Sequence, residues 1–292
     1  MGLPLVTRLL QAGCGVAVYS RTRAKADPLV DLGATVVDSP VELSDRDIVF
    51  TVVPGPAEFT DVVLGERGVL GHPDTAPRIL VDCSTISSEA SAAVRRAAEP
   101  RGMALVAAPI SGNGRHVAAG GALFAVSGAP EAIETARPYL EILGRGMHHL
   151  GQDDDARLVK LAHNLFLGAI IQSLIETTLL VQAAGIDRRA YLDFINDSPL
   201  GSTFSGYKTP ALVDLDWTPT FTTTLLRKDL DLGLAAASDL GVELPVTSAV
   251  REQVQMAIDA GHTEEDFAVM LAVQAQALGI ELAASPGEPA LR

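Results

Sequence analysis

Four short, almost wholly apolar runs occur in the first half of the chain, and each leads into a turn of small, polar or glycine-rich sequence. They span residues 47–53, 78–82, 103–109 and 123–128, and stretches with helical patterning separate them. Such runs are typical of strands that are buried on both faces, as in a parallel sheet covered by helices. Ligands of these sheets bind at the carboxyl ends of the strands. The pattern therefore predicts an α/β domain whose site is formed by the turns after the strands.

Two shorter strand signals, residues 16–19 and 33–37, come earlier in the chain, with a helix expected between them to about residue 32. Strand signals stop near residue 150, and helical periodicity then dominates to about residue 282. The length of 292 residues suits two domains. The sequence predicts an α/β domain over residues 1–150 and an all-helical domain over residues 151–292.

The formal net charge of −14 argues against nucleic acid or an anionic membrane surface as the main partner. Cys14 and Cys83 are the only cysteines, so we expect neither a disulfide framework nor a cysteine-rich metal site. This cysteine usage indicates a reducing, cytoplasmic compartment. Polar residues interrupt the longest apolar stretch, residues 165–184, which predicts a buried helix rather than a membrane span.

The N-terminus suggests part of a dinucleotide-binding motif. Such a domain begins with a strand, a G-x-G-x-x-G turn and a helix, whereas this chain opens directly with a helical pattern. Gly2 fits the third glycine of the motif, and the strand and the first two glycines would then lie upstream of Met1. Alternatively, Met1 is the true start and the chain binds no nucleotide.

Ser20, Arg21 and Thr22 follow the strand signal at residues 16–19. They stand about 20 residues after Gly2, where a dinucleotide-binding domain recognises the adenosine ribose. A carboxylate there would favour the 2′-hydroxyl of NAD, whereas Arg21 suits the 2′-phosphate of NADP because a guanidinium can pair with a phosphate through two hydrogen bonds. The sequence therefore predicts NADP(H) as the preferred cofactor and NAD(H) as the second choice. An ordinary solvated loop is the alternative interpretation.

Lys160 and Asn164 are four residues apart in a predicted helix, so they share one face of it. The chain has only four lysines, at positions 25, 160, 208 and 228, and most of its positive charge comes from arginine. A lysine can release a proton where an arginine cannot, which makes Lys160 a candidate acid/base for hydride transfer to a carbonyl. The simpler alternative is a partly buried lysine whose amine reaches water.

The order of several motifs resembles the β-hydroxyacid dehydrogenases, the family of 3-hydroxyisobutyrate dehydrogenase and related semialdehyde reductases. The resemblance extends from Gly2 to the region around residue 267. The matching stretches are Asp82-Cys83-Ser84-Thr85, residues 107–113, Lys160 to Asn164, and Lys228-Asp229-Leu230. The family has a Rossmann-type NAD(P)-binding domain followed by an all-α, 6-phosphogluconate-dehydrogenase-like domain. This resemblance implies the same fold here, with a homodimer or homotetramer as the assembly.

The resemblance also implies roles for individual residues. Lys160 would be the catalytic acid/base, and Asn164 would hold it or the substrate oxygen. The substrate would be bound by Ser111, Gly112, Asn113 and Ser202. The nicotinamide side of the cofactor would be contacted by Val53, Pro54 and Thr85, and Lys228 would close over it.

Three residues depart from the family pattern and alter the predicted pocket wall. Ala107 replaces an aspartate, Asn113 replaces a glycine and His163 replaces an asparagine. The sequence predicts an NADP-preferring oxidoreductase without a metal, which interconverts a small anionic β-hydroxyacid and its semialdehyde or reduces a short aldehyde acid. An imine reductase-like enzyme and a non-catalytic or incomplete relative that binds no cofactor are the alternatives.

Overall fold

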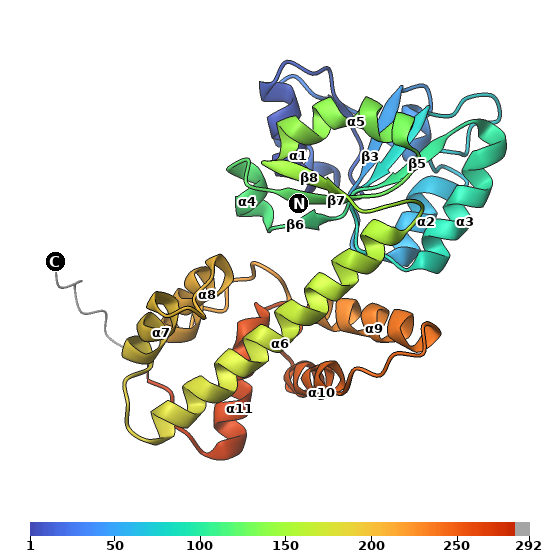
Figure 1. The fold of residues 1–292 in the computed structure, drawn as a ribbon. Coiled ribbons are helices and arrows are strands. Elements are labelled where there is room, and N and C mark those ends of the chain that lie inside the picture. The colour runs from blue at the N-terminus through green and yellow to red at the C-terminus, as the bar shows by residue number, and fades with distance from the viewer. Residues whose placement is uncertain (284–292) are drawn as a thin grey trace. The chain divides into compact units, whose positions relative to one another are not determined.

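The computed structural model describes residues 1–283. The chain divides into two compact units, the first over Met1–Leu161 and the second from Ala162 onwards. Strands and helices alternate in the first unit, and the second is helical (Figure 1). The predicted fold class, an α/β nucleotide-binding domain followed by a helical domain, is confirmed.

The strands of the first unit form three small sheets. Strands β1 (Ala17–Val18) and β2 (Thr35–Val36) pair in parallel. Strands β3 (Ile48–Thr51), β4 (Ile79–Asp82) and β5 (Ala104–Ala107) form a parallel sheet in which Thr51, Asp82 and Ala107 lie in register. The third sheet contains β6 (Ile110–Ser111), β7 (Leu123–Val126) and β8 (Gly146–His149).

Helices and short 3-10 turns connect these strands. The α-helices are α1 (Gly2–Gln11), α2 (Pro56–Leu64), α3 (Ser88–Ala98), α4 (Gly114–Ala118) and α5 (Pro130–Leu143). The 3-10 turns are η1 (Arg23–Lys25), η2 (Asp27–Leu29), η3 (Pro40–Leu43) and η4 (Glu99–Arg101).

The four apolar runs form β3, β4, β5 and β7 as predicted, but two details of the prediction are wrong. The segment before residue 32 forms two 3-10 turns instead of a helix, because Pro28 lacks a backbone N–H and restricts Asp27. Strand β6 pairs antiparallel with β7. The connection between them holds only the five-residue helix α4, and a parallel pair needs a crossover of about a dozen residues or more.

Strand β4 shows how the sheet is covered on both faces. Successive residues of a strand point to opposite faces, and both Leu80 and Val81 are completely buried. Val81 belongs to a core cluster that includes residues of α1 and α5. Leu80 belongs to another that includes residues of α2 and α3. This double burial leaves the ends of the strands as the part of the sheet open to ligands.

Helix α6 (Asp155–Ala183) begins in the first unit and continues into the second. The second unit also contains α7 (Arg188–Asp197), α8 (Thr203–Asp214), α9 (Thr223–Asp239), α10 (Pro245–Asp259), η5 (Phe267–Val269) and α11 (Met270–Leu278). Its core contains Ile171 and Ile175 from α6, Leu226 and Leu230 from α9, and Val254 from α10.

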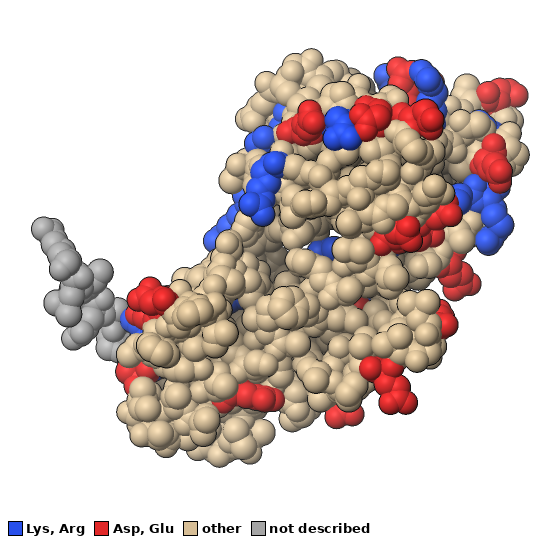
Figure 2. Space-filling view, viewed as in Figure 1, with Lys and Arg blue, Asp and Glu red and all other residues tan. Residues whose placement is uncertain are grey.

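Helix α6 is long and apolar enough to cross a membrane by length and composition alone, with a mean hydropathy of 1.6 over its most apolar 18 residues. The core helices of water-soluble proteins reach similar values. Four residues of α6 belong to the buried core of the second unit, namely Ile171, Leu174, Ile175 and Leu179. On the face shown in Figure 2, acidic and basic side chains are interspersed.

Candidate active site

The turns after β3 and β4 lie together at one edge of the sheet. These strands are parallel and in register, so the residues after Thr51 and Asp82 leave the sheet on the same side. The backbone N–H of Val53 donates to Ser84 Oγ over 2.9 Å, which joins the two turns directly. Val53 and Thr85 are half-buried and Pro54 is exposed. The structure thus brings together the three residues predicted to face the nicotinamide.

A buried carboxylate organises this edge. Asp82 is fully buried at the end of β4, and its Oδ1 accepts hydrogen bonds from Thr51 Oγ1 at 2.7 Å and from the Ser84 N–H at 3.3 Å. Its Oδ2 accepts from Nη1 of Arg157, at 2.6 Å, in the first turn of α6. Sequence reasoning quoted Asp82 within a motif but gave it no role, and it did not identify Arg157.

The predicted carboxylate-binding loop, Ser111 to Asn113, connects β6 to α4. Gly112 has φ +126°, and a Cβ added there would lie 3.1 Å from the Cβ of His116, so the loop requires glycine at this position. Asn113 caps α4, because its Oδ1 accepts from the His116 N–H at 3.1 Å. That oxygen also lies 2.9 Å from His116 Nδ1. The amide nitrogen of Asn113 is therefore the part of its side chain that remains to contact an anion.

The predicted adenosine-binding residues lie in the first unit. Gly2 is the first residue of α1, and Ser20, Arg21 and Thr22 follow β1. Arg21 is exposed and forms no ion pair with any residue in the described part of the chain. The nearby Arg23 is already occupied, since it pairs with Asp27 and Asp38. Of these two arginines, Arg21 is the one available to a phosphate.

Both predicted catalytic residues are buried in α6, Lys160 with 9% and Asn164 with 3% of its surface exposed. Within the second unit, Nδ2 of Asn164 donates to Oδ2 of Asp229. The ammonium of Lys228 lies 3.0 Å from the other oxygen of Asp229. Asp229 therefore joins two predicted site residues. Asp229 was given no role in the sequence analysis. Its place in the Lys228-Asp229-Leu230 motif, directly after a predicted site residue, could have identified it as a candidate.

Ser202 has a local role as the N-cap of α8. Its hydroxyl oxygen accepts from the Ser205 N–H at 3.1 Å, and the Ser205 hydroxyl oxygen accepts from the Ser202 N–H at 2.9 Å. This capping box satisfies backbone donors at the start of the helix. Ser202 is exposed, and its role in substrate binding stays a prediction.

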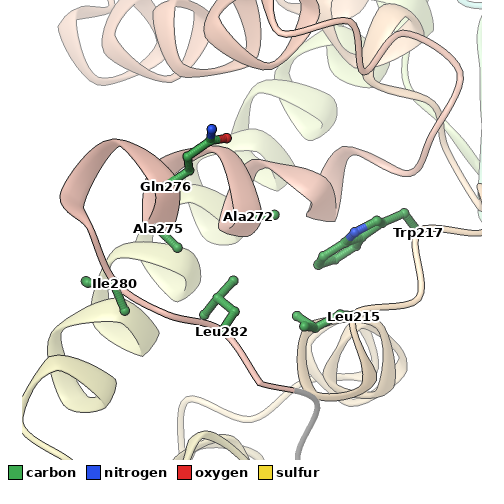
Figure 3. A pocket seen from close by; sticks show the side chains of 7 residues that line it. All are labelled: Leu215, Trp217, Ala272, Ala275, Gln276, Ile280 and Leu282. Carbon is green, nitrogen blue, oxygen red and sulfur yellow. The ribbon is translucent and has the colours of Figure 1, made fainter.

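A pocket of about 370 Å³ lies in the second unit, but none of the predicted site residues lines it (Figure 3). Its walls are mostly apolar and come from the segment after α8, from α11 and from the segment that follows α11, namely Leu215, Trp217, Ala272, Ala275, Gln276, Ile280 and Leu282. In residues 1–283, no group of three or more His, Cys, Asp or Glu side chains is arranged to hold a metal ion.

Comparison with known proteins identifies both parts of the chain. Residues 1–151 match the family model of the NAD-binding domain of 6-phosphogluconate dehydrogenase. Residues 155–274 match the model described as NAD-binding of NADP-dependent 3-hydroxyisobutyrate dehydrogenase. Together the two models cover almost all of the described residues.

Individual relatives give the same result. NAD-dependent L-serine dehydrogenase of Pseudomonas aeruginosa is 30% identical, over 92% of this chain and 93% of that protein. Glyoxylate/succinic semialdehyde reductase 2 of Arabidopsis thaliana is 28% identical, over 93% of this chain and 76% of that protein.

The fold also has a close counterpart among solved structures. A crystal structure of 3-hydroxyisobutyrate dehydrogenase from Salmonella typhimurium superposes with a TM-score of 0.84 at 23% identity, over 93% of this chain and 95% of that one. The family-model matches carry the functional assignment, and this superposition supports the fold. The chain belongs to the β-hydroxyacid dehydrogenase family and is an NAD(P)-dependent enzyme that acts on the CH–OH group of a hydroxyacid.

Proposed function

We propose that the protein is an NADP-preferring oxidoreductase that interconverts a small anionic β-hydroxyacid and its semialdehyde, or reduces a short aldehyde acid. The observation that carries this proposal is the position of Lys160. This buried lysine lies three residues after Arg157 in α6, and Arg157 contacts Asp82 at the strand end where a sheet of this kind binds its ligand. This position supports a role for Lys160 in proton transfer beside a nicotinamide.

The residues present fit a bound NADP(H). The turns after β1, β3 and β4 would hold it through Ser20, Arg21, Thr22, Val53, Pro54 and Thr85, with Gly2 at the start of α1 and Lys228 closing over it. Arg21 supports the preference for NADP because its guanidinium is exposed and unpaired within the described residues. The cofactor supplies or accepts the hydride.

The protein's own groups would bind the substrate and move the proton. The loop from Ser111 to Asn113 offers backbone N–H groups and the Asn113 amide to a carboxylate, and Ser202 would add a hydroxyl. During reduction, the Lys160 ammonium would donate a proton to the aldehyde oxygen as hydride reaches the carbon, which yields the alcohol; oxidation reverses both transfers. Asn164, which is held by Asp229, would orient Lys160 or the substrate oxygen.

The helical unit supports a homodimer or homotetramer. Five large apolar side chains there are exposed to between 67% and 77%, namely Phe166, Leu180, Phe194, Leu200 and Leu278. A second copy of the chain that covers them would remove this apolar surface from water. Light scattering of the purified protein measures this assembly. We also propose that the enzyme is cytoplasmic.

A fluorescence titration with NADPH and NADH tests the cofactor preference. Arg21→Ala should weaken NADPH binding about tenfold, the size expected for a lost charge-assisted hydrogen bond, and leave NADH binding unchanged. Arg23→Ala is the matched control, because Arg23 already pairs with Asp27 and Asp38. Equal affinity of the unaltered protein for both cofactors would contradict the NADP preference. Turnover with glyoxylate, succinic semialdehyde, 3-hydroxyisobutyrate and L-serine then separates the substrate classes.

A further inference from the structure

We infer that the buried ion pair between Asp82 and Arg157 positions Lys160 for proton transfer, so that both residues are positioning residues of the reaction. The inference rests on the proposed role of Lys160. All three residues belong to the first unit.

The Asp82 carboxylate holds three segments of the chain together. Its Oδ1 accepts from Thr51, the last residue of β3, and from the backbone of Ser84 in the turn after β4. Its Oδ2 accepts from Arg157 in α6, 75 residues away in sequence. The turns that carry Val53 and Thr85 and the helix that carries Lys160 are therefore fixed to one side chain.

Arg157 is held from its other side as well. Its Nε donates to Ser91 Oγ and to Asp154 Oδ1, both at 3.0 Å. Asp154 also accepts from Arg95 at 3.1 Å. A guanidinium is planar and rigid, so contacts at Nε and Nη1 fix its orientation. Ser91 lies in α3, and Asp82 is the last residue of β4. Arg157 therefore joins the first turn of α6 both to α3 and to β4.

The fixed turn sets the position of Lys160. Positions i and i+3 of a helix are neighbours on its surface, so Lys160 leaves α6 beside Arg157. A shift of about 1 Å in a reacting group can lower the rate about 100-fold. Loss of the Asp82 contact would allow the first turns of α6 to move relative to the turns after β3 and β4.

Stability alone gives a weak reason for this pair. Asp82 and Arg157 are 0% and 2% exposed, and a buried ion pair often adds no more stability than well-packed apolar residues would. The chain contains a matched pair elsewhere, between Lys208 and Asp266, with the same separation of 2.6 Å and equal burial. That pair lies within the second unit and joins α8 to the residue that precedes η5.

The experiment measures kcat, KM, the NADPH Kd and the deuterium isotope effect with NADPH deuterated at C4. All measurements are made at a temperature where circular dichroism shows each variant folded. Arg157→Met and Asp82→Asn should each lower kcat up to about 100-fold, leave the NADPH Kd almost unchanged and raise the isotope effect, because chemistry becomes rate-limiting. The double variant should be within about twofold of the worse single variant, since the pair acts as a unit.

Asp266→Asn is the control, because it breaks the other buried ion pair. It should lower the Tm and leave the kcat of the folded protein unchanged. Wild-type kcat and isotope effect in folded Arg157→Met would overturn the inference. If that variant does not fold, Asp82→Asn removes the carboxylate charge and retains an oxygen that accepts from Thr51 and Ser84, and wild-type kcat there would equally overturn the inference. Lys160→Met separates the proposed acid/base role of Lys160 from the positioning role of the ion pair. If Lys160→Met is fully active, the acid/base assignment is wrong. If Lys160→Met is inactive and Arg157→Met is fully active, only the positioning role is refuted.

Discussion

Two buried lysines in this protein, Lys160 and Lys208, occupy contrasting surroundings. Lys208 is 1% exposed and lies in α8. Its ammonium donates to Asp266 at 2.6 Å and to Thr220 at 2.9 Å, and it lies 3.9 Å from the centre of the Phe267 ring. Lys160, 9% exposed, lies in the part of α6 that is fixed to the strand-end edge of the α/β unit. The first lysine joins elements of the helical core, whereas the second lies near the strand ends at which we propose that the cofactor binds.

The electrostatics of the Lys208 pair suit a structural role. Burial lowers the pKa of Lys208, and the neighbouring Asp266 carboxylate partly opposes that effect. Burial alone would raise the pKa of Asp266, but the charge and hydrogen bond of Lys208, with the N–H groups of Ala268 and Thr220, bring it below its ordinary value. The aspartate therefore stays ionised and holds the lysine in place. Burial of a rare lysine is thus not enough to identify a catalytic one.

The largest expected effect is on turnover at Lys160. Lys160→Met should lower kcat about 10²- to 10⁴-fold, the usual contribution of a general acid, because no group remains to protonate the substrate oxygen. The Tm should change little, since methionine retains the apolar part of the side chain. Steady-state kinetics and thermal unfolding of the same preparation provide the two readings. Turnover at the wild-type rate would show that the comparison assigns the wrong lysine.

The reverse pattern is expected at Lys208. Lys208→Met leaves Asp266 buried without its cation, which should destabilise the helical unit by about 3–5 kcal/mol. The kcat of the protein that remains folded should be unchanged. Trp217 is the only tryptophan of the chain, and its carbonyl oxygen accepts from the Asp266 N–H at 2.9 Å. Urea unfolding followed by its fluorescence therefore reports on this unit, and a wild-type midpoint would contradict the structural role.

These contrasts show what local sequence patterns can predict. Apolar runs predicted β3, β4, β5 and β7, because every residue of these strands is buried or half-buried and the sequence is correspondingly apolar. Strand β8 was missed because its Gly-Met-His-His sequence is only half-buried or exposed. The turns after β3 and β4 were predicted to face the ligand, and the parallel register of these two strands brings Val53 and Thr85 to the same edge of the sheet.

Contacts between distant residues could not be predicted in the same way. Asp82 and Arg157 are 75 residues apart, and Lys208 and Asp266 are 58 apart. Neither pairing follows from periodicity or spacing. The scarcity of lysine applies equally to Lys160 and Lys208. The family motif from Lys160 to Asn164 selected Lys160, whereas the structural role of Lys208 is visible only in its three-dimensional contacts. Asp229 belongs to a motif that the sequence analysis named, but its hydrogen bond with Asn164, 65 residues away, could not be predicted from the sequence.

A third lysine, Lys228, extends the comparison because its neighbour Asp229 contacts another predicted site residue. Asp229 contacts both Lys228 and Asn164, so Asp229→Asn should lower kcat/KM about 10- to 100-fold, the range for a lost hydrogen bond to a charged group. Asp231→Asn is the matched control on the same helix. Asp231 pairs with Arg227 and Arg251 and is 43% exposed, so its loss should leave turnover unchanged. Equal effects of the two substitutions would remove Asp229 from the site.

The smallest expected effect is the pH dependence of the Lys208–Asp266 pair. The pKa of Asp266 in the folded protein lies below its ordinary value of 3.8. Its ionised form therefore contributes stability that is fully present above about pH 4 and is lost as the pH falls through the lower, folded pKa. Asp266→Asn lacks this contribution at every pH. The difference in unfolding midpoint between the wild type and this variant, followed by Trp217 fluorescence, should be large at pH 7 and shrink towards pH 2. A difference that is constant across this range would mean that packing around residue 266, and not its charge, holds Lys208 in its structural role.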